Sequence, residues 1–171
     1  ISAILAALVA VLGIFSVRLA NFKLTFEGIP IYVGALLLGP SVGCSVAFIG
    51  TLISQFILYG LSPTTPMWML PPIVVGLIAG LYAKKHDYQL TRKRNMIILV
   101  FCSLVRTTLN TIFLYLDAKF YGYYTPSLIW GMLVPRYIIA VVQGIAYALI
   151  IPELVDRLRE ALKIDGSWAR S

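Results

Sequence analysis

Long apolar stretches that carry almost no charge follow one another along this chain, and they constrain its fold more than any other feature. Hydrophobic residues make up 60% of the sequence and charged residues 12%, whereas soluble domains usually contain about 45–50% and about 25%. A helix of roughly 20 apolar residues crosses the hydrocarbon core of a bilayer. The chain is therefore expected to be an integral membrane protein, which excludes a soluble enzyme, a disordered chain and a disulfide scaffold.

The apolar stretches predict one all-α domain over residues 1–171, with six transmembrane helices in a compact bundle. The opening stretch lacks the charged start and small-residue cleavage site of a signal peptide, so we expect it to be a membrane span. Prolines predict a loop over 61–69, a fourth helix that begins at Pro71, and a charged amphipathic tail over 152–171. The predicted spans are residues 1–17, 28–39, 42–59, 71–83, 96–116 and 127–151.

Basic residues indicate how the helices are oriented, because cytoplasmic loops collect Lys and Arg. Nine of these residues fall in the loop 84–95 and the tail 152–171, and three fall in the opposite loops. With an even number of spans, both termini are expected in the cytoplasm. The net charge of +7 then follows from topology and contact with the lipid bilayer, and it calls for no nucleic-acid partner.

Two arginines, Arg106 and Arg136, fall within the apolar spans. A charge near the middle of a membrane costs at least about 2.5–3.5 kcal/mol and normally faces a cavity, a partner or the bundle interior. No Asp or Glu lies within the same two predicted spans. Either the arginines cap backbone carbonyls, which Pro135 favours for Arg136, or they line a polar substrate cavity. Asn110 lies one helical turn from Arg106, on the same face.

Aromatic residues are concentrated toward the predicted outer side, among them Phe26, Trp68 and Trp130. Aromatic belts form at both membrane interfaces, so an excess on one side indicates an additional role, such as stacking against a planar ring of a ligand. Trp68 lies between Pro66 and Pro71 in the predicted loop, which suggests a lid.

Sequence motifs for ATP binding and for common kinds of catalysis are missing from the sequence. It contains no phosphate-binding loop, no H-E-x-x-H and no G-x-S-x-G motif. Cys44, Cys102 and His86 lack the spacing of a metal site, so no cofactor is expected. A polar cavity without its own energy source indicates a binding subunit rather than an enzyme, and small residues on the first span, Ala3, Ala6, Ala7 and Ala10, offer a face for a second membrane protein.

These features resemble the substrate-binding S components of energy-coupling factor (ECF) transporters. The resemblance covers nearly the whole chain and includes Ala3-x-x-x-Ala7, the segment FEGIPIYVGALLLGPSVG over 26–43 and the stretch LVPR over 133–136. It implies capture of a vitamin from outside, a membrane coupling subunit that contacts Ala3, Ala6, Ala7 and Ala10, and two cytoplasmic ATPases. It also implies a binding pocket toward the outer side, formed by Phe26, Trp68, Arg106, Asn110, Trp130 and Arg136.

The substrate is expected to be a water-soluble vitamin or its precursor. The aromatic residues favour a hydroxymethylpyrimidine or pyridoxine type, and two unpaired arginines make folate the next choice. A stand-alone membrane channel or a membrane-embedded enzyme remains the alternative.

Overall fold

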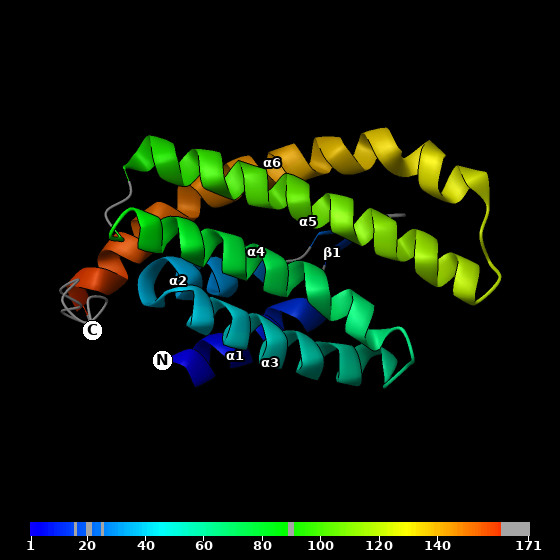
Figure 1. The fold of residues 1–171 in the computed structure, drawn as a ribbon, viewed down its shortest axis with the longest axis horizontal. Helices are drawn as coiled ribbons and strands as arrows, with labels where there is room; N and C mark the ends of the chain where they lie inside the picture. Colours follow the sequence, from blue (N-terminus) through cyan, green and yellow to red (C-terminus); the bar gives the residue numbers. More distant parts are fainter. Residues whose placement is uncertain (16, 20–21, 25, 89–90, 162–171) are drawn as a thin grey trace.

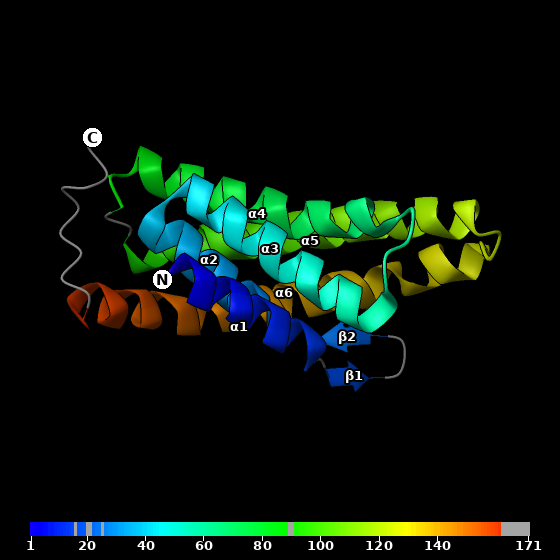
Figure 2. The same ribbon diagram turned by 90° about the horizontal axis from the view of Figure 1, so that it is seen from below.

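The computed structural model describes residues 1–15, 17–19, 22–24, 26–88 and 91–161. Within these residues the chain forms six α-helices and one antiparallel β-hairpin. The helices lie lengthwise in one bundle, and the start of α1, the start of α5 and the end of α6 share one end of it (Figures 1 and 2). The elements are α1 (Ser2–Ile14), β1 (Val17–Leu19), β2 (Phe22–Leu24), α2 (Gly28–Leu38), α3 (Pro40–Tyr59), α4 (Thr65–Lys85), α5 (Arg92–Phe120) and α6 (Pro126–Ala161).

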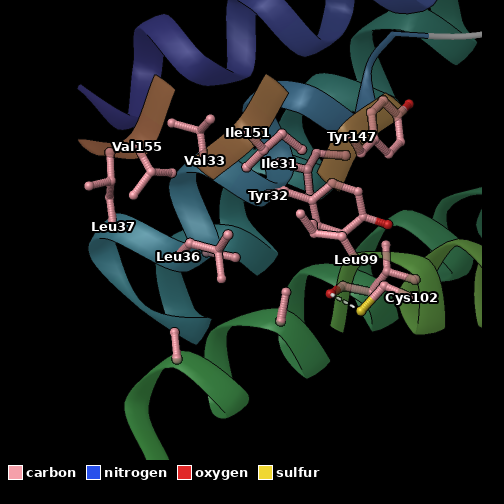
Figure 3. Close-up of a cluster of buried hydrophobic side chains, with 14 of the residues drawn as sticks. Ile31, Tyr32, Val33, Leu36, Leu37, Leu99, Cys102, Tyr147, Ile151 and Val155 are labelled. Atoms are coloured by element: carbon pink, nitrogen blue, oxygen red, sulfur yellow. Dashed lines mark hydrogen bonds between the residues drawn. The ribbon is translucent and has the colours of Figure 1, made fainter. Parts of the chain in front are cut away.

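Helix α2 forms the centre of the bundle. Nine of its 11 residues are buried, and it packs against α1, α3, α4 and α6. Figure 3 shows its apolar side chains meeting those of α5 and α6, including Tyr32 beside Tyr147. Because its neighbours surround it, α2 is apolar on every face, and its length of about 17 Å does not have to match the thickness of a bilayer.

Four helices, α3, α4, α5 and α6, are long and apolar enough to cross a membrane, whereas α1 and α2 are shorter apolar helices. Each of the six predicted spans corresponds to a helix. The prediction of a helical membrane protein is therefore confirmed, and α1 and α2 fall below the length of an ordinary span.

Two helix boundaries that were predicted at prolines, Pro71 and Pro152, are wrong. Helix α4 begins at Thr65, so Trp68 lies in a helix and not in a lid loop. Pro66 occupies the first turn, where the missing N–H has no helical partner, and the backbone N–H of Ser62 donates a hydrogen bond to Thr65 Oγ1 at 2.9 Å. Helix α6 likewise continues through Pro152 to Ala161. Neighbouring helices allow membrane helices to tolerate such internal prolines.

Other differences concern shorter segments. The predicted basic loop 84–95 is reduced, because Lys84 and Lys85 end α4 and Arg92 begins α5. Residues 152–161 of the predicted tail belong to α6, and 162–171 lie outside the described residues. The hairpin was not predicted, since two strands of three residues are too short to show alternation.

Helices α3 and α4 approach closely where two glycines meet. A methyl group at Gly76 would lie 2.9 Å from the carbonyl oxygen of Gly43. Small residues allow such backbone contact between membrane helices, and this contact holds together α3 and α4, two of the helices that line the cavity described next.

Candidate substrate-binding site

A cavity of about 580 Å³ lies among α3, α4, α5 and α6. It follows α5 from Ser103 to Asp117, a rise of about 21 Å along the helix, and it reaches the end of the bundle that carries the α3–α4 and α5–α6 connections. Its lining is largely polar and aromatic. The lining residues are Glu27, Thr51, Gln55, Tyr59, Ser62, Thr64, Trp68, Pro72, Ser103, Arg106, Thr107, Asn110, Leu114, Asp117, Tyr121, Arg136, Ile139, Ala140, Gln143 and Tyr147.

An ion pair lies in the part of this cavity that is farther from the α5–α6 connection. Arg106 on α5 donates a hydrogen bond from Nη2 to Glu27 Oε1, and both side chains are 12% exposed. The expectation that Arg106 is unpaired was therefore wrong. Glu27 precedes α2 and lies outside every predicted span, and only the folded chain brings it to a residue 79 positions away.

The pair leaves one terminal nitrogen of Arg106 available. Nη1 is buried and has no hydrogen-bond partner among the described residues. The hydroxyl of Thr51 on α3, also in the cavity wall, is likewise buried and has no hydrogen-bond partner among the described residues. Buried polar groups are nearly always satisfied, so these two atoms are suited to hydrogen-bond a bound molecule.

Arg136 reaches the cavity from α6 and is half-buried. In the described part of the chain its guanidinium makes no ion pair and no hydrogen bond to a backbone carbonyl. The cap proposed for Arg136 beside Pro135 is therefore not observed. Arg136 differs from Arg106 in that it presents a positive charge with no carboxylate bonded to it.

Amide and carboxyl groups supply further polar positions. Asn110 and Gln55 line the cavity, and Gln143 donates a hydrogen bond from Nε2 to the Tyr147 hydroxyl at 2.7 Å. Asp117, near the end of the cavity at the α5–α6 connection, is 8% exposed and accepts a hydrogen bond from the Tyr123 hydroxyl. The same end of the cavity is also aromatic, with Trp68, Tyr59 and Tyr121 in its wall.

The structure brings together four of the six predicted binding residues: Trp68, Arg106, Asn110 and Arg136 line one cavity. Phe26 and Trp130 are not among its lining residues, and they are 42% and 69% exposed. The sequence analysis did not identify Glu27, Thr51 and Asp117. Both carboxylates lie at the edges of apolar stretches, and this position was the available signal.

The four alanines on α1 do not share one surface. Ala3 and Ala7 are exposed, whereas Ala6 and Ala10 are 3% and 5% exposed within the bundle. A methyl group at Gly50 on α3 would lie 2.7 Å from the backbone oxygen of Ala6. Ala6 and Ala10 therefore serve packing between α1 and the bundle, and only Ala3 and Ala7 remain available to another protein.

Residues 1–160 match the family described as ECF-type riboflavin transporter, S component. The chain belongs to this family. S components are non-catalytic transport subunits of the membrane, so the expectation of a transport subunit rather than an enzyme is confirmed at the level of the family, as is a multi-pass membrane location.

Curated relatives of this S-component chain share a shorter segment with it. A UPF0397 protein of Lactobacillus johnsonii is 46% identical over 55 residues, which cover 32% of this chain and 29% of that protein. A UPF0397 protein of Lactobacillus helveticus is 42% identical over 67 residues, which cover 39% of this chain and 34% of that protein. The chain thus spans about a third of the length of the curated relatives that it matches.

Proposed function

We propose that this chain captures a neutral, elongated, ring-containing vitamin from outside the cell for an ECF importer. The observation that supports the proposal most strongly is the cavity, with an ion-paired arginine inside and aromatic residues at its outer end. Binding sites for small molecules commonly combine a largely preformed cavity with a few placed polar groups. A membrane coupling subunit and two cytoplasmic ATPases would supply the energy for import.

The charges in the cavity wall favour a neutral substrate. Arg106 and Arg136 contribute two positive charges, and Glu27 and Asp117 contribute two negative charges, so the formal sum is zero. An anionic ligand would gain from Arg136 but would also lie near two carboxylates. Folate and other anionic vitamins are therefore the weaker choice, because only one of the two arginines, Arg136, lacks a bonded carboxylate in the described part of the chain.

The length of the cavity favours a molecule larger than one ring. A hydroxymethylpyrimidine or pyridoxine would occupy only part of a cavity that follows α5 for about 21 Å. Riboflavin has a fused ring system and a hydroxylated chain, and the matching family is described as a riboflavin transporter. We place riboflavin first, the single-ring vitamins second and folate third.

The proposed topology has six membrane crossings and both termini in the cytoplasm. The starts of α1 and α5 and the end of α6 share one end of the bundle (Figure 1). Lys84 and Lys85 at the end of α4 and Arg92 at the start of α5 lie there as well, as expected for a cytoplasmic end. The cavity reaches the opposite end, from which the vitamin would enter. Ala3 and Ala7 would contact the coupling subunit.

Native mass spectrometry of the detergent-purified chain, followed by extraction, tests this function. A stoichiometric vitamin would support the proposal and identify the substrate. A panel of riboflavin, pyridoxine, hydroxymethylpyrimidine and folate, titrated against tryptophan fluorescence, ranks the ligands, and Trp68→Phe is the control because Trp68 lines the cavity. Failure to bind any of them, together with ion conductance in liposomes, would contradict the proposal and favour the stand-alone channel. Turnover of a panel member would favour the membrane enzyme.

A further inference from the structure

We propose that Glu27 is a positioning residue that links helix α1 to the cavity, so that displacement of α1 at Gly13 weakens substrate binding. The inference rests on the proposed function and adds a means of regulating the same site. Glu27 lies between two contacts. One of its carboxylate oxygens binds Arg106 in the cavity wall, and the other faces α1.

The contact with α1 is close. A methyl group at Gly13 would lie 2.9 Å from Glu27 Oε2 and 3.1 Å from Ser54 Cβ on α3. Neither Gly13 nor Ser54 lines the cavity. The backbone of α1 at Gly13 therefore lies directly against a carboxylate whose other oxygen belongs to the substrate site, and a side chain at position 13 requires this carboxylate, Ser54 or α1 to move.

The backbone next to Glu27 is already packed against another helix. A methyl group at Gly28 would lie 2.8 Å from the hydroxyl oxygen of Tyr147, so the chain is already in contact with α6 one residue later. The end of the Glu27 side chain is the part that can shift. Because this end is bonded to Arg106, a shift would move the guanidinium or break the ion pair, and either change alters the cavity.

The same link works in both directions. Coupling between two sites is reciprocal in free energy, so a protein that binds α1 and displaces it lowers substrate affinity to the extent that substrate opposes the displacement. Ala3 and Ala7 leave a surface of α1 open to such a protein.

The first test compares two Gly→Ala variants with riboflavin as the probe. Gly13→Ala is expected to weaken riboflavin binding about 5- to 20-fold, within the usual range for coupled sites. Gly34→Ala is the matched control, because its methyl group would lie 3.4 Å from Leu5 Cδ1 on α1, an ordinary contact that does not involve Glu27. Equal binding by Gly13→Ala and wild type, or an equal loss in Gly34→Ala, would overturn the proposal.

Two further experiments test the link if Gly13→Ala fails to fold or if the ligand is not riboflavin. Where Gly13→Ala fails to fold, Gly13→Ala/Ser54→Gly removes the second close contact, and unchanged riboflavin affinity relative to Ser54→Gly alone counts against the link. The second experiment is NMR spectroscopy and needs no ligand. The ¹⁵Nε chemical shift of Arg106 should change in Gly13→Ala and stay the same in Gly34→Ala. A wild-type protein that binds no vitamin would contradict the proposed function, whereas an unmoved Arg106 signal would contradict this link alone.

Discussion

Tyr123, just beyond the end of α5, donates a hydrogen bond from its hydroxyl to Asp117, a carboxylate in the cavity wall. Burial around the hydroxyl raises the pKa of Tyr123, and the hydrogen bond to Asp117 and the negative charge of that residue raise it further, to about 12. The connection between α5 and α6 is thus joined to the cavity wall by a hydrogen bond that requires a protonated tyrosine.

This bond predicts a loss of stability at high pH. The pKa of Tyr123 is higher in the folded than in the unfolded chain, so its contribution is complete below pH about 10 and is lost as the pH rises toward about 12. We expect the Tm of the detergent-purified protein to fall over this interval, and to fall less in Tyr123→Phe. Tyr121→Phe, which keeps the Asp117 bond, is the control, and an identical pH profile for Tyr123→Phe and wild type would contradict the assignment.

A second prediction concerns the Arg106–Glu27 pair. Arg106→Met leaves the buried Glu27 carboxylate without this partner, and breaking a buried pair costs about 3–5 kcal/mol. We expect a fall in Tm of roughly 10 °C, taking a few degrees per kcal/mol for a chain of this size. Glu27→Gln/Arg106→Met should recover most of the Tm but not substrate binding. Recovery of both would show that the pair is structural only.

The sequence predicted the helices well, because apolar stretches separated by polar or Gly-Pro segments report directly on membrane helices. It failed where a neighbouring helix decides the outcome. Pro71 and Pro152 look like boundaries when read locally, yet both lie inside helices. The rotation of α6 about its axis decides that Arg136 lines the cavity while Trp130 remains exposed, and spacing along one helix does not fix that rotation.

The partner of Arg106 was missed for a related reason. Glu27 lies just before the predicted span 28–39, outside the two spans that carry the arginines, and it is 79 residues from Arg106 along the chain. The position of Arg106 inside an apolar span predicts that it needs a polar partner. Only the tertiary structure identifies Glu27 as that partner. The sequence also could not show which alanines of α1 are buried and which are exposed, because this depends on the side of α1 against which α3 packs.

A third prediction tests whether Arg136 contacts the substrate. Arg136→Met removes a half-buried charge that has no partner in the part of the chain described by the structure, so the Tm should stay constant or rise. A hydrogen bond to a charged group contributes about 1.5–3 kcal/mol, so we expect substrate affinity to fall about 10- to 100-fold. The measurement is the Kd of riboflavin, with Arg136→Lys expected to retain part of the affinity. An unchanged Kd in Arg136→Met would exclude this contact.

The last prediction separates binding from import through the exposed alanines of α1. Ala7→Trp places a large side chain on the surface of α1 that Ala3 and Ala7 leave open, so it should block close approach of a coupling subunit. We expect vitamin uptake by cells or proteoliposomes that contain the complete transporter to be lost, and vitamin binding by the isolated chain to be unchanged. Ala146→Trp, at an exposed alanine of α6, is the matched control and should transport normally. Equal loss of uptake in both variants would indicate a general effect of bulk in the bilayer, and loss of binding in Ala7→Trp would place the defect in the fold of α1 rather than in its contact with another subunit.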